Sequence, residues 1–290
     1  MFLKRFLKKG IEVSNNPIFV PNKKIKLMQD IEMRMAERKS LNRLCDISDW
    51  CVGGDLTNIM KELGEGSYIH RKSWEYALCV YGLNYMGVVK PDSVAISVGA
   101  GHERPLFYYA NRIKEMVATD LYNTPGLEGE PRFLTHPEEF APFPYRKDHL
   151  TIHQMSGTDL RFEDNTFDFA FTLSSIEHFG GRKNSRKAMH EIYRVLKPGG
   201  VACITTELLL NNSTHPEYFT YKELEETIIR ATDFRLVGGD IDFRISSSIF
   251  YNPIELDVEK NIQISPHIVL KHGENIWTSI NLFFLKPQRA

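Results

Sequence analysis

From about residue 90 onward, apolar runs that favour strands alternate with stretches of helical periodicity. This pattern predicts strands at 93–98, 117–120, 149–155, 167–173, 201–207, 234–243 and 278–285. It also predicts helices at 105–116, 185–196 and 220–231, and a turn at 197–200. Parallel strands need long crossover connections, which are usually helices. The alternation therefore indicates an α/β protein with a mostly parallel sheet covered on both faces.

Residues 1–64 lack this alternation, and we expect them to form a polar, basic helical extension to a domain that spans residues 65–290. Close to residue 30, apolar residues recur near the helical period and predict a helix over 26–44: they are Leu27, Ile31, Met35 and Leu41. Further helices are expected over 54–66 and 70–87, and both patterns end at glycines.

The composition excludes several classes of function. With 36 Lys and Arg against 37 Asp and Glu, the net charge of −1 offers no general basic surface for nucleic acid. Apolar runs are too short to span a membrane. The basic first ten residues lack a signal-peptide core, and they favour a solvated helix over a contact with anionic lipid. The cysteines form no CxxC pair and indicate reduced thiols in a cytoplasmic protein: Cys45, Cys51, Cys79 and Cys203.

A glycine turn follows the strand at 93–98. Gly99, Ala100 and Gly101 let the backbone approach a ligand closely, and the helix behind them offers free N–H groups. Asp120 ends the next strand, at the place where a carboxylate can accept the hydroxyls of a ribose. The combination predicts a bound nucleoside.

Glu103 stands where a dinucleotide-binding turn has its third glycine. A carboxylate there would repel a pyrophosphate, but it would tolerate the positive charges of S-adenosylmethionine. Glu103 also suits the first turn of a helix as an anion, and the two roles are compatible. The turn therefore favours S-adenosylmethionine over a nicotinamide dinucleotide.

In order along the chain, the stretches "ISVGAGHE", "VATD", "MSGTDLRFEDNTFDFAFTLSSIEHF" and "AMHEIYRVLKPGGVACITTE" resemble the class I S-adenosylmethionine-dependent methyltransferases. The resemblance covers residues 65 to 287. It implies a Rossmann-like sheet of seven strands, mostly parallel, with an antiparallel last strand. Ser97 departs from the acidic residue usual in that family, and Glu103 from its glycine. Ser97 weakens the expected hold on the cofactor's amino end.

The same resemblance implies a set of cofactor contacts. Gly99 and Gly101 would lie against the methionine part, and Asp120 would bind the ribose. Asp159 would lie near the adenine amino group, with Leu160 packed on the ring. The full predicted set is Gly99, Ala100, Gly101, Glu103, Asp120, Leu121, Thr158, Asp159, Leu160 and Ser174.

The acceptor is expected beyond the fourth and fifth strands of the domain. His178 is a candidate general base or hydrogen-bond donor there, and a structural histidine bonded to backbone is the alternative. Glu207 is a weaker catalytic candidate. Predicted substrate contacts are Glu177, His178 and His215. Ser174 and Glu177 also have the spacing of a capping box that begins a short helix. No HxH or HxxxH pair supports a metal, so no metal is predicted.

Three further segments bear on the site. The first lies just ahead of the first strand of the domain, where this family often closes over its cofactor, and contains Tyr68, His70, Arg71 and Trp74. Trp74 also fits an ordinary helix core. The additions at 122–148 and 246–276 are expected to set substrate choice.

The predicted function is methyl transfer to an oxygen or nitrogen of a small or carbohydrate-type acceptor. "HRKSWEYALCVYGL" ahead of "VGAGHE" resembles bacterial members associated with sugars and cell-surface polysaccharides. The alternatives are a catalytically silent binding subunit of the same fold and, third, a nicotinamide-dependent oxidoreductase.

Overall fold

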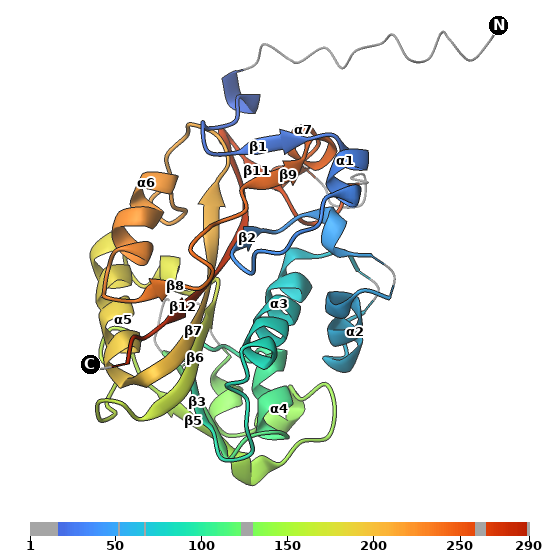
Figure 1. Cartoon of the computed structure of the whole chain (residues 1–290). Coiled ribbons are helices and arrows are strands. Elements are labelled where there is room, and N and C mark those ends of the chain that lie inside the picture. The colour runs from blue at the N-terminus through green and yellow to red at the C-terminus, as the bar shows by residue number, and fades with distance from the viewer. Residues whose placement is uncertain (1–16, 52, 67, 123–129, 259–264, 289–290) are drawn as a thin grey trace, which may run out of the picture.

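One large sheet organises the chain (Figure 1). The computed structural model describes residues 17–51, 53–66, 68–122, 130–258 and 265–288. The basic segment at residues 1–10, predicted as a solvated helix, lies outside the described residues.

The centre of the sheet is parallel: β3 (Val94–Val98), β4 (Glu115–Asp120), β5 (Leu150–Gln154), β6 (Phe167–Leu173) and β7 (Leu196–Leu209). The long β12 (Asn275–Leu285) pairs antiparallel with β7, and the short β8 (Arg235–Leu236) pairs antiparallel with β12. The strand order β5-β4-β3-β6-β7-β12-β8 therefore contains seven strands, of which only β12 runs against the others. This confirms the predicted fold class.

Short strands that the sequence did not predict extend this architecture. β2 (Arg43–Leu44) pairs with β12, and β11 (Leu270–His272) and β10 (Ile254–Glu255) continue the same sheet beyond it. β1 (Lys26–Met28) and β9 (Arg244–Ser246) form a separate parallel pair.

The helix predicted over 26–44 was wrong for most of its length, because only α1 (Asp30–Met35) is helical. The apolar spacing that suggested a buried stripe misled the prediction. Ile31 and Met35 are 70% and 83% exposed, whereas Met33, between them, is fully buried.

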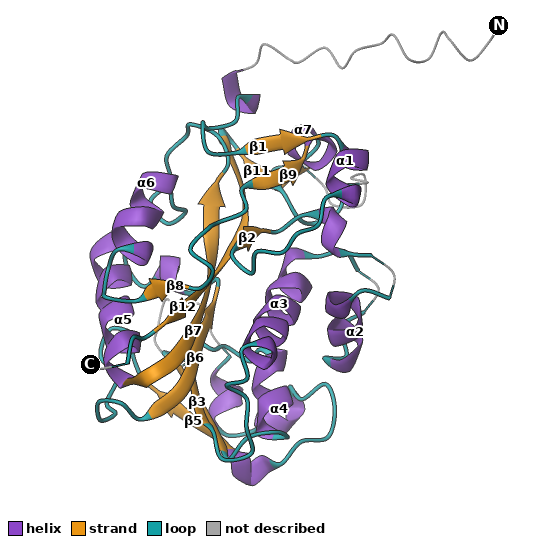
Figure 2. Ribbon diagram, in the orientation of Figure 1, coloured by secondary structure: helices purple, strands orange, loops and turns teal. Residues whose placement is uncertain are grey.

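Helices cover both faces of the sheet, with α2, α3 and α4 on one side and α5 and α6 on the other (Figure 2). Their bounds are α2 (Asp55–Glu62), α3 (Arg71–Tyr85), α4 (Arg104–Ala110), α5 (Arg182–Val195), α6 (Tyr221–Leu224) and α7 (Ser247–Tyr251). The predicted capping box at α6 is present, with Thr220 and Glu223 each bonded to the other's backbone N–H. Helix α4 ends earlier than predicted.

The predicted turn at 197–200 lies inside β7 as a bulge. Leu196 pairs with Phe167, but the next partners are Val201 and Phe169, so the intervening residues leave the ladder. The bulge makes β7 longer than the predicted strand.

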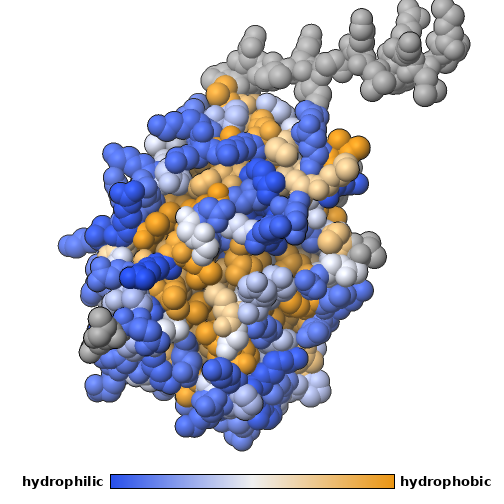
Figure 3. All heavy atoms as spheres, in the orientation of Figure 1, coloured by the Kyte–Doolittle hydropathy of each residue, from blue (hydrophilic) through white to orange (hydrophobic). Residues whose placement is uncertain are grey.

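The strand order reverses direction at β3, which lies between β4 and β6. In open α/β sheets, ligands bind at such a switch point, outside the carboxyl ends of the strands. No helix in the described part of the chain is long and apolar enough to cross a membrane. Figure 3 shows hydrophilic side chains around the visible face and hydrophobic ones across its centre.

Candidate active site

A tight glycine turn follows β3 at the switch point. Gly99 and Gly101 have φ angles of 71° and 51°, in the left-handed region that glycine tolerates best. The N–H groups of Gly99 and Ala100 donate to the carbonyl of Thr119, at 2.8 and 3.0 Å. A Cβ on Gly99 would lie 2.6 Å from Cβ of Ser175, so this turn packs directly against the loop after β6.

Asp120 ends β4 beside this turn and is partly buried. Its Oδ2 accepts from the N–H of Gly101 at 2.9 Å, and its Oδ1 accepts from the N–H of Leu121 at 2.6 Å. Burial raises the pKa of Asp120, and these two bonds oppose that rise. A carboxylate has about four acceptor positions, so two remain for a ligand.

Two adjoining hollows open at the carboxyl ends of the strands. The main cavity, of about 870 Å³, is lined by Gly99, Asp120, Leu121, Met155, Ser156, Gly157, Ser174, Ser175, His178, Phe179, Gly180 and Glu217. A side hollow of about 220 Å³ shares Gly99, Asp120, Ser174 and Ser175 with it, and adds Lys72, Tyr76, Ala100, Gly101, His102, Glu103 and Leu173. Together they receive residues from the loops after five strands.

Most of the predicted cofactor residues lie on these walls, but the predicted adenine contacts do not. Thr158, Asp159 and Leu160 line neither hollow. Leu160 is 3% exposed, and its N–H donates to Glu191 at 2.8 Å, which ties it to α5. Met155, directly after β5, lies on the wall instead; its position at the end of a predicted strand was the signal that could have identified it.

Glu103 lies just before α4 and is buried. Burial raises the pKa of Glu103 well above its usual range, and the nearby carboxylates Glu75 and Asp120 raise it further, against the opposing effect of Lys72. The side chain makes no cap hydrogen bond to α4. Both roles that the sequence predicted for Glu103, to repel a pyrophosphate and to act as an anion in the first turn of a helix, require its ionised form. Burial disfavours that form.

Helix α3 contributes to the site through residues that the sequence analysis missed. Lys72 and Tyr76, one helical turn apart, line the side hollow. Lys72 Nζ donates to the carbonyl of Leu173 at 3.1 Å and pairs with Glu75 at 2.7 Å. The sequence contained a signal for this pair: Lys72 and Tyr76 are four residues apart on the helix predicted over 70–87, so they lie on the same face of it.

The predicted closing residues themselves have mostly structural roles. Trp74 is fully buried and donates from Nε1 to Asp49 at 2.7 Å, in agreement with the core interpretation. Tyr68 is 83% exposed. His70 caps α3, accepting from the N–H of Lys72 at 3.0 Å, and stacks on His267.

His178 lies on the wall of the main cavity, and its partner is Glu217, which the sequence analysis did not single out. His178 Nδ1 is 3.2 Å from Glu217 Oε2, and both side chains are 46% exposed. A carboxylate only accepts hydrogen bonds, so Nδ1 carries the proton when this bond forms and Nε2 is left with a lone pair. No sequence spacing connects the two residues, because they follow different strands.

Arg182 and His215 hold the loop that carries Glu217. Arg182 donates to the carbonyls of His215, Glu217 and Tyr218. His215 Nδ1 accepts from the N–H groups of Glu217 and Tyr218, both at 3.1 Å. His215 therefore shapes this loop through its hydrogen bonds, and it lines neither hollow.

Glu177 and Glu207, predicted as a substrate contact and a catalytic candidate, are also behind the wall. Glu177 is fully buried and accepts from Thr206 Oγ1 at 2.8 Å. Burial, with the nearby charge of Glu207, raises the pKa of Glu177 to about 7. Glu207 is 3% exposed and pairs with Arg71 of α3.

The predicted capping box at Ser174 and Glu177 does not form. A short 3-10 helix, Ile176–His178, begins here, but Ser175 precedes it as the cap residue. Ser174 adopts a φ of 53°, which is uncommon for a residue other than glycine. This bend turns Ser174 toward both hollows.

The additions expected to set substrate choice are partly described. In 130–148, Phe133 is fully buried and packs edge-on against Phe107 of α4. In 246–276 the described residues form α7, β10 and β11. Within the described ranges, no group of three His, Cys, Asp or Glu residues is arranged to hold a metal ion.

Residues 96–204 match a protein family described as "Methyltransferase domain". A search of the curated proteins found no match. Among solved structures, the chain is similar to the YcgJ protein from Bacillus subtilis, with 13% identity over 74% of this chain and 99% of that one, and a TM-score of 0.48. It is also similar to an S-adenosylmethionine-dependent methyltransferase from Methanosarcina mazei, with 15% identity over 71% of this chain and 98% of that one, and a TM-score of 0.44. A third similar structure is an S-adenosylmethionine-dependent methyltransferase from Aquifex aeolicus, with 15% identity over 79% of this chain and 98% of that one, and a TM-score of 0.42. The family match therefore covers the part of the chain that runs from β3 into β7.

Proposed function

We propose that the chain transfers the methyl group of S-adenosylmethionine to an oxygen or nitrogen of a small or carbohydrate-type acceptor. One observation carries this proposal: the His178–Glu217 pair lies on the wall of the same cavity that Gly99 and Asp120 line. A proton acceptor and a nucleoside-binding edge therefore share one space.

The residues of the two hollows fit the cofactor. Asp120 has free acceptor positions for the ribose hydroxyls. A Cβ on Gly101 would meet no atom within 4 Å, so the backbone there is open to a ligand. Glu103 Oε2, in the side hollow, is buried and has no hydrogen-bond partner in the described chain, which suits the ammonium of a methionine end. Lys72, in the same hollow, suits its carboxylate.

When bound, S-adenosylmethionine supplies a methyl carbon activated by a sulfonium. The chain's part is to hold the acceptor in line and to remove its proton. Glu217 would orient the imidazole of His178 through Nδ1, which leaves Nε2 as the nitrogen with a lone pair to act as the base. A hydroxyl of the acceptor would give its proton to Nε2 as its oxygen bonds to the methyl carbon and the bond from that carbon to sulfur breaks. An ammonium would give up its proton first, and the neutral amine would then attack.

All four cysteines are free thiols, which supports the cytoplasmic location that the sequence predicts. A role in polysaccharide biosynthesis stays a prediction from the sequence resemblance.

Calorimetry with S-adenosylhomocysteine and with NAD tests the cofactor assignment. We expect the wild-type protein to bind S-adenosylhomocysteine and not NAD. Asp120→Ala removes two charge-assisted hydrogen bonds and should weaken binding by about 100-fold or more. Asp55→Ala is the matched control, because Asp55 is exposed and lines neither hollow, and it should leave the affinity unchanged. Equal affinity for NAD, or an unaffected Asp120→Ala protein, would reject the assignment.

Transfer of a labelled methyl group to a panel of small hydroxyl and amine compounds tests the base. Loss of the imidazole in His178→Ala should lower turnover by about 10²–10⁴-fold while the affinity for S-adenosylhomocysteine stays near wild type. Glu217→Gln retains a hydrogen-bonding side chain and should lower turnover less. A His178→Ala protein with a lower melting temperature and undiminished turnover would show that the histidine is structural. A protein that binds the cofactor but methylates nothing in the panel would favour the silent binding subunit.

A further inference from the structure

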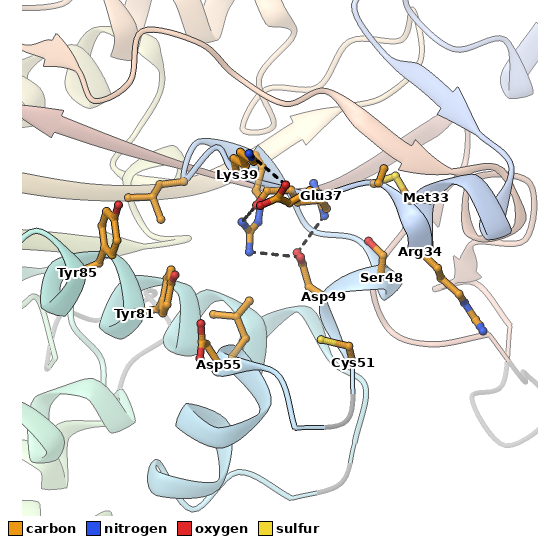
Figure 4. A pocket seen from close by; sticks show the side chains of 15 residues that line it. Met33, Arg34, Glu37, Lys39, Ser48, Asp49, Cys51, Asp55, Tyr81 and Tyr85 are labelled. Carbon is orange, nitrogen blue, oxygen red and sulfur yellow. Dashed lines mark hydrogen bonds and ion pairs between the residues drawn. The ribbon is translucent and has the colours of Figure 1, made fainter.

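A second cavity lies between α3 and the segment that joins α1 to α2 (Figure 4). We call it the polar pocket. It has a volume of about 600 Å³, and its lining includes Arg38, Arg43, Ser48, Asp49, Tyr81 and Tyr85. None of its described lining residues lines the main cavity or the side hollow. The methyltransferase site therefore does not account for it.

Buried ion pairs make the floor of the polar pocket rigid. Asp49 pairs with Arg38 at 2.9 Å and with Arg43 at 3.3 Å, and it accepts from Trp74 Nε1 at 2.7 Å. Arg38 also donates to Asp242 and to the carbonyl of Leu44. All three guanidinium nitrogens of Arg38 thus have partners, and its side chain is held in one place.

Arg43 is satisfied less completely. Its terminal nitrogens reach the carbonyls of Arg38 and Ser40 and the carboxylate of Asp49. Its Nε is buried and has no hydrogen-bond partner in the described chain, and the same is true of Ser48 Oγ. Arg43 is 6% exposed. A buried donor without a partner costs about 1–3 kcal/mol, so a ligand that supplies acceptor oxygens here would recover that loss.

The charges at the mouth of the polar pocket do not decide the ligand's sign. Lys39 pairs with Glu37 at 3.1 Å, and Arg34 and Asp55 add one charge of each sign. The buried side chains do decide it, because arginine only donates hydrogen bonds. Burial lowers the pKa of Arg43, and the nearby charge of Arg38 adds to this effect against Asp49 and Asp242, so a nearby oxyanion would stabilise its charged form.

One wall of the polar pocket is aromatic. Tyr81 and Tyr85 lie one turn apart on α3, with ring centres 6.1 Å apart and planes at 19°. Tyr85 is 74% exposed, so its ring is accessible from solvent. Figure 4 shows the two rings along the helix, with Asp49 and Ser48 on the segment across from them. Flat, accessible rings of this kind favour a ligand with a ring of its own.

We propose that the polar pocket binds a small molecule in which a carboxylate or phosphate group is attached to a ring. The oxyanion would accept from Arg43 and Ser48, and the ring would pack on Tyr81 and Tyr85. This site is separate from methyl transfer and does not depend on the proposed function.

Cys51 provides a local readout. It lines the polar pocket and is exposed, whereas Cys45, Cys79 and Cys203 are buried. A thiol reagent such as dithiobis-nitrobenzoate should therefore modify Cys51 first in the folded protein, and a bound ligand should slow that reaction. Cys51→Ser identifies the reacting residue, because it should abolish the fast phase.

Glucuronate, glucose 6-phosphate and adenosine monophosphate carry both parts of the proposed ligand. At millimolar concentrations at least one of them should slow the modification of Cys51 several-fold, and comparing them separates carboxylate from phosphate. Glucose lacks the oxyanion and inorganic phosphate lacks the ring, so each should protect less. S-adenosylhomocysteine should not protect. Protection by none of the three compounds, or equal protection by glucose, would overturn the proposal.

Two variants test the contacts. Ser48→Ala removes one hydrogen bond to a charged group, which should weaken protection about tenfold. Tyr85→Ser removes an exposed ring without disturbing the core and should also weaken it. Both proteins should melt as the wild type does. Unchanged protection in both variants would show that the ligand, if one binds, does not use this pocket.

Discussion

The main cavity and the polar pocket are built in opposite ways. The main cavity collects residues that lie at or just beyond the ends of the strands of the sheet, such as Gly99, Asp120 and Ser174. The polar pocket collects residues from α1, α2 and α3 and from the segment that joins α1 to α2, and buried ion pairs with Asp49 hold its floor. The first site follows from the order of the strands, and the second follows from how separate segments pack.

This difference explains why sequence reasoning reached one site and not the other. Parallel strands bring all their carboxyl ends to one edge, so a position in the strand pattern becomes a position in space. No comparable rule relates positions in the sequence to positions in the polar pocket. Asp242, which binds Arg38, lies 204 residues further along the chain. Substitutions and a change of pH show whether each region is as constrained as this comparison implies.

The largest expected effect is at Met33, which lines the polar pocket and is fully buried. Met33→Ala should lower the free energy of unfolding by about 2–5 kcal/mol, because it leaves a cavity. Ile31→Ala, on the same helix but 70% exposed, is the matched control and should change it by less than about 0.5 kcal/mol. Urea denaturation measures both. A larger loss of unfolding free energy for Ile31→Ala than for Met33→Ala would show that the helix face with Ile31 is the buried one, as the sequence predicted.

An intermediate effect is expected at the glycine turn. In Gly99→Ala, the new Cβ would lie 2.6 Å from Ser175 and 3.0 Å from the ring of Phe179, at a φ unfavourable to alanine. We expect a loss of about 2–4 kcal/mol in unfolding free energy, together with weaker binding of S-adenosylhomocysteine. Gly101→Ala has a similar φ but open space, so about 1–2 kcal/mol is expected. Equal losses in thermal or urea unfolding would contradict the close packing at Gly99.

The smallest effect concerns the pH dependence of stability through Glu177. Its pKa of about 7 in the folded chain exceeds the usual 4.5, so folding favours the protonated acid. The resulting cost is absent below pH 4.5, grows as pH rises toward 7, and is constant above it. Glu177→Gln resembles the neutral acid and should stabilise the protein by roughly 1–3 kcal/mol at pH 8, and by much less at pH 4.5. A difference that is the same at both values would show that Glu177 is ionised throughout.

Particular elements show how far the sequence could lead. The strand at 167–173 and the capping box at Thr220 were predicted as they are found, since both depend on neighbouring residues. The helix over 26–44 failed because both ends of this segment pair as short strands with β9 and β12, which lie far along the chain. β2 was missed because two residues become a strand only where β12 is there to pair with them. His178 was predicted as a site residue, but its partner Glu217 lies 39 residues away on another loop, and only packing brings them together.

By itself the sequence determined the order of the strands, the glycine turn and the carboxylate at the end of β4. Local patterns encode these features, since side-chain periodicity and backbone freedom act over a few residues. The tertiary structure alone decided the ionisation of Glu103 and Glu177 and the pairing of His178 with Glu217. It also decided the existence of the polar pocket. Desolvation and charge pairing depend on which distant groups surround a side chain, and no local pattern carries that information.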